Sequence, residues 1–209
     1  MKPDFEIVVV GTSTGGLKAL QTLLRSLSPV FPLPVVVVQH RGKDADVELC
    51  EFLAREVALP VTEPEDKEEI LPGHIYLAPR DYHLLLENRS FALSIDVPVG
   101  FARPSIDVLF ESAAAEYQEK TIGVILTGAN RDGARGLAAI KSRGGFAVVE
   151  APESAVRREM PEAAIASTKP DLVLPLGEIA HELFKLVESV NTKTLRRPEE
   201  SALTTHYGN

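Results

Sequence analysis

The sequence is poor in the features that mark secreted and membrane proteins. Among its 209 residues there is one cysteine, Cys50, so no disulfide bond can form within the chain. No secretory leader precedes the first predicted strand, and the apolar runs are too short to span a membrane. We therefore expect a cytoplasmic protein without membrane insertion. Cys50 lies in a helical pattern, and we interpret it as a buried core thiol.

Positive charge and clustered metal ligands are also scarce. The formal net charge is −8, which does not suit a surface that neutralises phosphates, so nucleic acid is not an expected partner. The histidines and the cysteine do not stand at zinc-ligand spacings, so we expect no metal and no cofactor. The length suits one large domain or two small ones with a sizeable core. A monomer is the default expectation.

The stretch from Glu6 to Gly16, EIVVVGTSTGG, predicts a strand, a tight turn and the start of a helix. The turn places Ser13 at the C-terminal end of a strand, at the G-x-S-x-G spacing of a nucleophile elbow. Two other interpretations stay open at this point: a plain tight turn, or an anion-binding loop at a helix N-terminus. A nucleotide-binding loop is disfavoured, because the stretch contains neither G-x-G-x-x-G nor a lysine after the glycines.

Strands and helices alternate along most of the chain, which predicts an α/β fold: a doubly wound, mostly parallel β-sheet flanked by helices. After the first strand we expect extended segments at 34–39, 60–63, 74–77, 83–87, 91–95, 121–126, 146–150 and 172–174. The strands at 83–87 and 91–95 predict an antiparallel β-hairpin, added to the sheet as an insertion or at its edge. After the first helix we expect helices over 45–57, 105–120, 134–143, 154–168 and 177–190. We expect one domain, residues 1–190, and a polar, disordered tail, residues 191–209.

Three junctions after predicted strands have reactive side chains: Ser13, His40 and Asp132. The C-terminal ends of parallel strands lie along one edge of a sheet, so these residues can converge there. Serine needs an imidazole to take its proton, and a carboxylate to orient and stabilise that imidazole. The order Ser, His, Asp differs from the usual α/β-hydrolase order, which argues against that fold but not against the chemistry. Asp107 is the main rival for the acid role, and His83 could also reach a cleft.

Six motifs occur in one order along the chain. They are GTSTGG after a strand, QH at the end of a valine-rich strand, YLAP with a following histidine, RPSIDVLFESAA, ILTGANRDGARGLAAIK, and MPEAAI with LVLPL. Together they resemble the catalytic domain of the chemotaxis protein-glutamate methylesterases, the CheB family. The resemblance extends over roughly Ile7 to Val187, nearly all of the chain that we expect to be ordered.

The resemblance implies roles for individual residues. Ser13 matches the nucleophile, His40 the general base and Asp132 the acid of the family. Ala129 stands where the family has a methionine that lends its backbone N–H to the oxyanion, and this N–H is retained. The candidates for oxyanion or substrate contacts are Thr14, Ala129, His83 and Arg103.

Three further positions depart from the family pattern. Asn130 replaces a glycine, which matters if that position requires φ > 0, although asparagine tolerates the left-handed conformation better than most residues. Ala102 replaces a histidine and Glu159 a glycine. These last two changes bear on the fit of the substrate rather than on the triad.

The implied reaction is hydrolysis of γ-glutamyl methyl esters on the cytoplasmic helices of chemoreceptors, with deamidation of selected glutamines. Family members commonly have an N-terminal receiver domain over the active site. Here the first strand starts within a few residues of Met1, so two interpretations stay open: the sequence lacks a receiver that belongs to a longer protein, or it is a standalone esterase, with a separate receiver protein as a candidate partner. Without such a lid we expect a constitutively exposed Ser13 cleft. The alternative is a catalytically weak interaction or regulatory module, which the changes at Ala102, Ala129 and Asn130 suggest.

Overall fold

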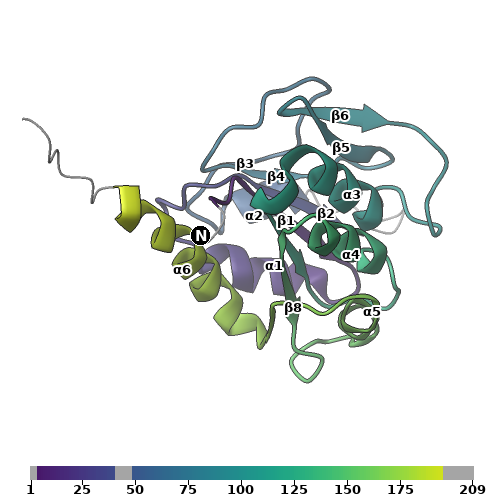
Figure 1. Ribbon diagram of the computed structural model, residues 1–209. Coiled ribbons are helices and arrows are strands. Elements are labelled where there is room, and N and C mark those ends of the chain that lie inside the picture. Colours follow the sequence, from purple (N-terminus) through teal and green to yellow (C-terminus); the bar gives the residue numbers. More distant parts are fainter. Residues whose placement is uncertain (1–3, 41–48, 195–209) are drawn as a thin grey trace, which may run out of the picture.

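A seven-stranded parallel sheet forms the centre of the molecule (Figure 1). The computed structural model describes residues 4–40 and 49–194. All neighbouring strands of the sheet run parallel. In order across the sheet they are β3 (Val61–Thr62), β4 (Ile75–Leu77), β2 (Val35–Gln39), β1 (Ile7–Thr12), β7 (Thr121–Ile125), β8 (Phe146–Glu150) and β9 (Leu172–Leu174). The predicted α/β fold class is confirmed.

The strand order creates a switch point beside β1. The chain first adds β2, β3 and β4 on one side of β1, and it then returns to place β7, β8 and β9 on the other side. In open parallel sheets, ligands bind outside the carboxyl ends of the strands where the winding direction reverses. The loops after β1, β2 and β7 therefore flank the place where this fold builds a site.

The central strands consist of β-branched and other apolar residues that suit burial on both faces. β1 reads IVVVGT, and all six residues are buried. β2 reads VVVVQ, and only its last residue is partly exposed. A strand that is covered on both faces needs no polar alternation, which explains why these runs are continuous.

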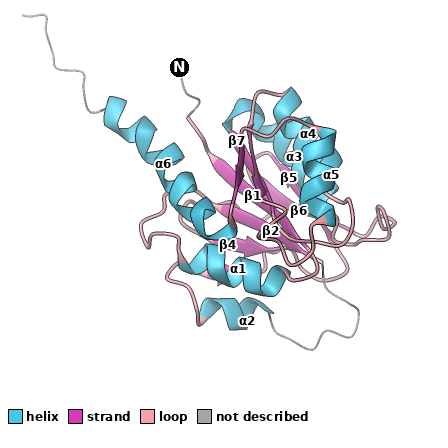
Figure 2. Ribbon diagram, turned by 90° about the horizontal axis from the view of Figure 1, so that it is seen from below, coloured by secondary structure: helices cyan, strands magenta, loops and turns pink. Residues whose placement is uncertain are grey.

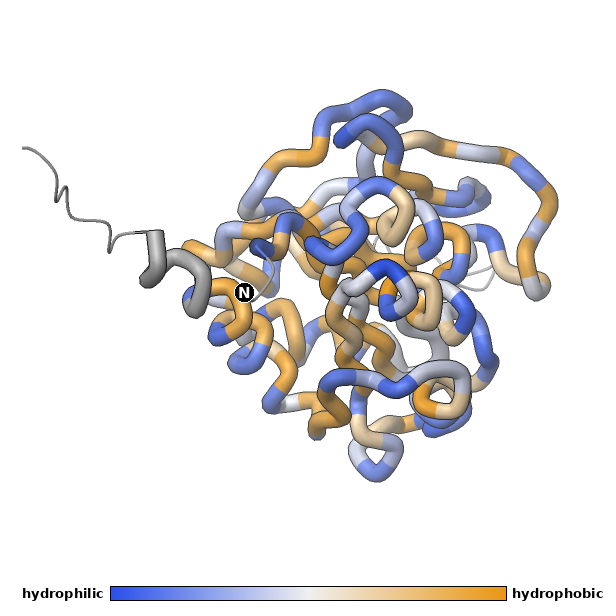
Figure 3. Tube along the Cα trace, in the orientation of Figure 1, coloured by the Kyte–Doolittle hydropathy of each residue, from blue (hydrophilic) through white to orange (hydrophobic). Residues whose placement is uncertain are grey.

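Helices cover both faces of the sheet (Figure 2). They are α1 (Gly16–Arg25), α2 (Leu49–Ala54), α3 (Ile106–Tyr117), α4 (Ala134–Ser142), α5 (Glu159–Ser167) and α6 (Leu176–Thr194). One core joins α1, α2 and α6 to the sheet, and the other joins α3, α4 and α5 to its opposite face. Apolar residues of the strands and helices make up both cores, and Figure 3 shows apolar residues concentrated in the interior of the molecule. Among the described residues, no helix combines the length and apolarity that crossing a membrane requires.

The predicted hairpin is present, but it does not extend the main sheet. β5 (His83–Glu87) and β6 (Ser90–Ser94) pair antiparallel as a separate two-stranded sheet. It lies over α3, at the top of Figure 1. Leu84, Leu86 and Phe91 share a core with Phe110 of α3. The hairpin therefore adds a layer outside α3, because its apolar face is buried against that helix.

Several predicted boundaries were wrong. Of the helix expected over 154–168, only Glu159–Ser167 is helical. Pro161 explains this start, because proline lacks an N–H and fits only the first turn of a helix. The helix expected over 45–57 is observed at Leu49–Ala54, and its start lies outside the described residues. α6 continues to Thr194, four residues beyond its expected end. The remainder of the predicted tail lies outside the described residues.

Candidate active site

The structure brings Ser13, His40 and Asp132 to the switch point. Ser13 follows β1, His40 follows β2, and Asp132 lies in the loop after β7. Backbone hydrogen bonds hold the three junctions together. The N–H of Ser13 donates to the carbonyl of Thr127 over 3.0 Å, and the N–H of His40 donates to that of Thr12 over 3.0 Å. Three segments that are distant in sequence thus form one rim.

The glycines of GTSTGG meet two different steric demands. A Cβ at position 11 would lie 2.3 Å from Cγ2 of Ile106, so Gly11 allows α3 to approach β1. Gly15 has φ +84°, in the left-handed region that glycine adopts without strain. The N–H of Gly16 donates to the carbonyl of Ser13 over 2.8 Å and closes the turn. The turn presents Ser13 partly exposed at the start of α1.

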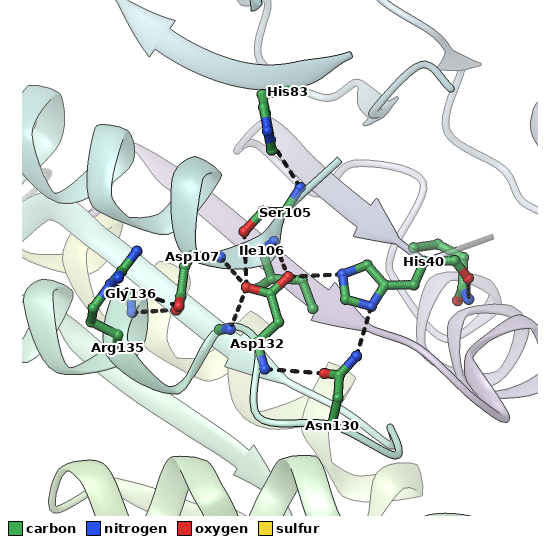
Figure 4. A network of polar contacts seen from close by, with 11 residues as sticks. His40, His83, Ser105, Ile106, Asp107, Asn130, Asp132, Arg135 and Gly136 are labelled. Atoms are coloured by element: carbon green, nitrogen blue, oxygen red, sulfur yellow. Dashed lines mark hydrogen bonds and ion pairs between the residues drawn. The ribbon is translucent and has the colours of Figure 1, made fainter. Parts of the chain in front are cut away.

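His40 and Asp132 form a hydrogen-bonded pair (Figure 4). Nε2 of His40 lies 2.8 Å from Oδ2 of Asp132, and the two side chains are 13% and 7% exposed. An ionised carboxylate only accepts hydrogen bonds, so the proton of this contact belongs to Nε2. The pairing fixes the orientation of the imidazole and leaves Nδ1 as its basic nitrogen.

The Asp132 carboxylate also caps the N-terminus of α3. Its oxygens accept hydrogen bonds from the N–H groups of Ile106 and Asp107 over 2.7 and 3.0 Å. The hydroxyl of Ser105 and the N–H of Gly133 donate to Oδ1 over 2.9 and 3.0 Å. Burial by itself would raise the pKa of Asp132, but the hydrogen bonds from His40, Asp107 and Ile106 lower it below the ordinary aspartate value. Asp132 is therefore an ionised partner for the imidazole.

Asp107, the rival candidate for the acid, faces elsewhere. Its Oδ1 accepts the N–H of Gly136 over 2.7 Å, and its Oδ2 lies 3.7 Å from Nε of Arg135. Burial is the main reason that the pKa of Asp107 is raised. Its carboxylate ties α3 to α4, whereas His40 pairs with Asp132 (Figure 4). Only the backbone of Asp107 contributes to the site, through its N–H.

Asn130 bridges the Asp132 loop and the imidazole. Its Oδ1 accepts the N–H of Asp132 over 3.0 Å, and its Nδ2 lies 3.2 Å from Nδ1 of His40. Asn130 is not among the described non-glycine residues with positive φ. The position therefore does not require φ > 0, and the replacement of glycine brings no backbone strain here. The turn is instead stabilised by the asparagine side chain, as in other Asx turns.

A cavity of about 490 Å³ opens beside Ser13. Its walls include Ser13, Thr14, Gln39, His40 and Asn130, together with residues 80–81, 98 and 100–104. Within the described part of the chain, no hydrogen bond joins Oγ of Ser13 to His40. The hydroxyl and the imidazole nevertheless line the same cavity, and solvent or a substrate can enter between them.

Two backbone N–H groups are candidates to hold an anion: that of Thr14, which lines the cavity, and that of Ala129, which directly precedes the lining residue Asn130. Those of Thr14 and Ala129 have no acceptor among the residues that the structure describes. Thr127 holds their two loops together, because its hydroxyl donates to the carbonyl of Thr14 over 2.9 Å. The N–H of Ser13 already donates to the carbonyl of Thr127, so it is not available to an anion. This arrangement leaves Thr14 and Ala129 as the candidate oxyanion donors.

His83 and Arg103, the other candidates for substrate contacts, have structural partners. His83 is only 2% exposed. Its Nδ1 accepts the N–H of Ser105 over 3.2 Å, and its Nε2 lies 3.2 Å from the carbonyl of Val97. His83 is thus buried away from the cavity, and its position does not support substrate contact. Arg103 lines the cavity, but its Nη1 donates to the carbonyls of Ile95 and Asp96 over 2.9 and 3.1 Å.

Three positioning residues were not singled out from the sequence. Nε2 of Gln39 donates to the carbonyls of Ser13 and His40 over 3.0 and 2.8 Å, so one amide links the serine turn to the histidine. Glu150, buried at the end of β8, accepts the N–H of Thr127 over 2.8 Å. Burial raises the pKa of Glu150. The QH motif placed Gln39 beside the site, but nothing in the sequence indicated the contacts of Glu150 or Thr127.

No metal centre is indicated in the part of the chain that the structure describes. Within residues 4–40 and 49–194, no group of three or more histidine, cysteine, aspartate or glutamate side chains could hold an ion. The arrangement instead offers a hydroxyl, an imidazole, a carboxylate and two N–H groups. This is the set of groups that serine hydrolases use.

Comparisons with known proteins identify the family of the chain. The family described as CheB methylesterase matches residues 8–183, and the chain belongs to this family. A protein of Leptospira interrogans is 48% identical over 189 residues, which cover 90% of this chain and 97% of that protein. A protein of Carboxydothermus hydrogenoformans is 40% identical over 184 residues, which cover 85% of this chain and 54% of that protein. The second is named protein-glutamate methylesterase/protein-glutamine glutaminase 1, and the first carries the corresponding name provisionally.

A solved structure supports the fold at the level of coordinates. The CheB methylesterase catalytic domain of Thermotoga maritima matches with a TM-score of 0.83 and 39% sequence identity. The match covers 88% of this chain and 100% of that chain. The chain thus corresponds to the catalytic domain of the family. It spans about half the length of relatives such as the one from Carboxydothermus hydrogenoformans.

Proposed function

We propose that this chain is a protein-glutamate methylesterase that also deamidates glutamines, with Ser13 as its nucleophile. The observation that carries the proposal is the convergence of Ser13, His40 and Asp132 at the switch point of a CheB-family domain. Each of the three groups is needed for acyl transfer from an ester or amide to serine. We propose that residues 1–190 form this catalytic unit.

The chemistry follows from the hydrogen bonds of the imidazole. Nε2 of His40 donates to Asp132, so Nδ1 is the nitrogen that takes the proton of Ser13 as Oγ attacks the ester carbonyl. The Asp132 carboxylate then stabilises the imidazolium. His40 returns the proton to the departing methoxide, which leaves as methanol. A water molecule, activated by the same nitrogen, hydrolyses the acyl-serine and releases glutamate; with a glutamine substrate the leaving group is ammonia.

The oxyanion needs donors that are already in place. In this proposal the N–H groups of Thr14 and Ala129 donate to the negative oxygen of the tetrahedral intermediate. Both belong to short loops that Thr127 clamps together. Loss of one such donor costs about 10²–10³ in turnover in other serine hydrolases. Because the donor is a backbone N–H group, alanine at position 129 can stabilise the oxyanion as well as methionine.

The rim of the cavity suits a protein substrate better than a small molecule. Ile95, Val97 and Phe101 are 74%, 80% and 104% exposed on the segment that borders the cavity. Exposed apolar side chains that gather beside a site commonly mark contact with another protein. We propose that the cytoplasmic helices of chemoreceptors bind here, which places the chain in the cytoplasm.

The direct test is methanol release from methylated receptor membranes. Wild type should release methanol, and Ser13→Ala should release none above background while it unfolds at the same denaturant concentration as wild type. Ser142→Ala is a matched control, because that serine is exposed at the end of α4 and its hydroxyl donates only within the helix. Retained activity in Ser13→Ala would refute the assignment of the nucleophile. An inactive wild type would favour the interaction module instead.

A further inference from the structure

The side-chain amide of Asn130 has an unambiguous orientation. A backbone N–H can only donate, so the atom that faces the N–H of Asp132 over 3.0 Å must be the amide oxygen. The amide nitrogen then faces Nδ1 of His40 over 3.2 Å. That nitrogen also only donates. Asn130 therefore gives a hydrogen bond to the imidazole and receives none from it (Figure 4).

The two contacts of His40 are mutually consistent. The carboxylate of Asp132 requires a proton on Nε2, and the amide of Asn130 requires a lone pair on Nδ1. Together they specify one neutral tautomer of the imidazole. That tautomer has a single lone pair in the ring plane, and Asn130 occupies it.

Ser13 needs the same lone pair. In the described residues its hydroxyl makes no hydrogen bond to His40, although both line the cavity. We propose that Asn130 is a latch on the general base: its amide competes with Ser13 for Nδ1 and holds the free protein in a state of low activity. The inference rests on the proposed function and adds to it a residue that restrains the chemistry.

The latch must open during catalysis. When Nδ1 takes the serine proton it becomes a donor, and it then faces the N–H of Asn130 without an acceptor between them. The amide has to turn away or be drawn off at that moment. Asn130 is exposed on the cavity wall, so a carbonyl oxygen of a bound protein substrate can accept its N–H and release His40.

The test measures acylation of Ser13 by a small fluorophosphonate probe, which is too small to draw Asn130 away. In Asn130→Ser, the short hydroxyl can still accept the N–H of Asp132 but cannot reach His40. Asn130→Ala removes both contacts. We expect the second-order labelling rate to rise about two- to tenfold in both variants, in line with one neutral hydrogen bond of about 0.5–1.4 kcal/mol. Arg131→Ala, an exposed change in the same loop, should leave the rate unchanged.

A spectroscopic readout separates the latch from a general disturbance of the loop. The ¹⁵N resonance of Nδ1 in His40 should move downfield in Asn130→Ser, as expected for a nitrogen that loses a hydrogen bond, while Nε2 remains protonated. Unchanged or slower labelling in both variants, with Ser13 still labelled in wild type and not in Ser13→Ala, would overturn the latch alone. Absence of Ser13-dependent labelling in wild type and in both variants would overturn the proposed function itself.

Discussion

Asp132→Asn is the most informative single change, because one carboxylate serves both the imidazole and α3. Its two oxygens accept hydrogen bonds from His40, from the hydroxyl of Ser105 and from three backbone N–H groups. An asparagine has one accepting oxygen. If that oxygen takes the position of Oδ1, its NH₂ faces His40 and the N–H of Ile106, both of which donate in wild type.

The loss of activity follows from the tautomer. An NH₂ at this place forces Nε2 of His40 to accept, so the ring proton moves to Nδ1 and the base is lost. The equivalent exchange in the serine protease triad lowers turnover about 10⁴-fold for this reason. We expect turnover of Asp132→Asn, measured as methanol release from methylated receptors, to be about 10³–10⁴-fold lower than that of wild type. The loss should be smaller than in Ser13→Ala.

The loss of stability can be worked from the same contacts. A buried N–H of Ile106 without an acceptor costs about 1–3 kcal/mol, and an anion at a partly buried helix N-terminus contributes up to about 2 kcal/mol. We expect the free energy of unfolding, from denaturant titration, to fall by on the order of 2–4 kcal/mol. Asp107→Asn is the matched control: it is a neighbouring buried aspartate whose raised pKa gives no stabilisation from its charge. It should retain activity and stability.

The dependence on pH checks the origin of this loss. The pKa of Asp132 is lowered in the folded protein, so its contribution is fully present above the ordinary aspartate value, about 3.9. The contribution disappears as the pH falls through the lower folded value. The difference in free energy of unfolding between wild type and Asp132→Asn should therefore become smaller below about pH 4. A gap that is small at pH 7, or constant from pH 7 into acid, would refute the assignment of an ionised cap.

Three further predictions concern the residues that hold the site. Gly11→Ala places a Cβ against Ile106 and should destabilise by about 1–3 kcal/mol, measured by denaturant titration, with lower activity because the start of α3 shifts. Gln39→Leu removes the amide that links two carbonyls of the site; kcat should fall about tenfold while the fluorophosphonate probe still labels the serine, as one lost hydrogen bond of about 1.4 kcal/mol implies. Burial raises the pKa of Glu150, so wild-type stability should decrease as pH rises from the ordinary glutamate value through the folded one. Glu150→Gln should lack this decrease and be at least as stable at pH 7, and a large destabilisation of this variant at pH 7 would contradict the inference.

The sequence was sufficient to predict the strands of the sheet and the edge of the sheet at which the candidate site lies. The valine runs of β1 and β2 are buried on both faces, and such runs are readable without any tertiary information. Because the strands run parallel, the C-terminal ends of β1, β2 and β7 lie at the same edge of the sheet, and this does not depend on the conformation of the loops. This is why Ser13, His40 and Asp132 could be grouped before the structure was known.

What the sequence left open depends on contacts between distant segments. The place of Asp132 after a predicted strand favours it over Asp107, but the choice depends on which carboxylate faces His40 and which faces Gly136. His83 has the composition of a cleft residue, but its two ring nitrogens are used by Ser105 and Val97. For Asn130 the sequence indicates only that a glycine is replaced, whereas in the structure its side chain contacts both the N–H of Asp132 and His40.

The double use of Asp132 affects how sequences of this family can be interpreted. A descendant that abandoned hydrolysis but kept the fold would still need an acceptor for the N–H groups at the start of α3. An aspartate at this position is therefore retained for folding and says little about activity. The side chain of Ser13 has no comparable structural role, since its hydroxyl has no hydrogen-bond partner among the described residues. When a related chain is screened for loss of catalysis, the serine is the position to inspect first, and the aspartate is the last to change.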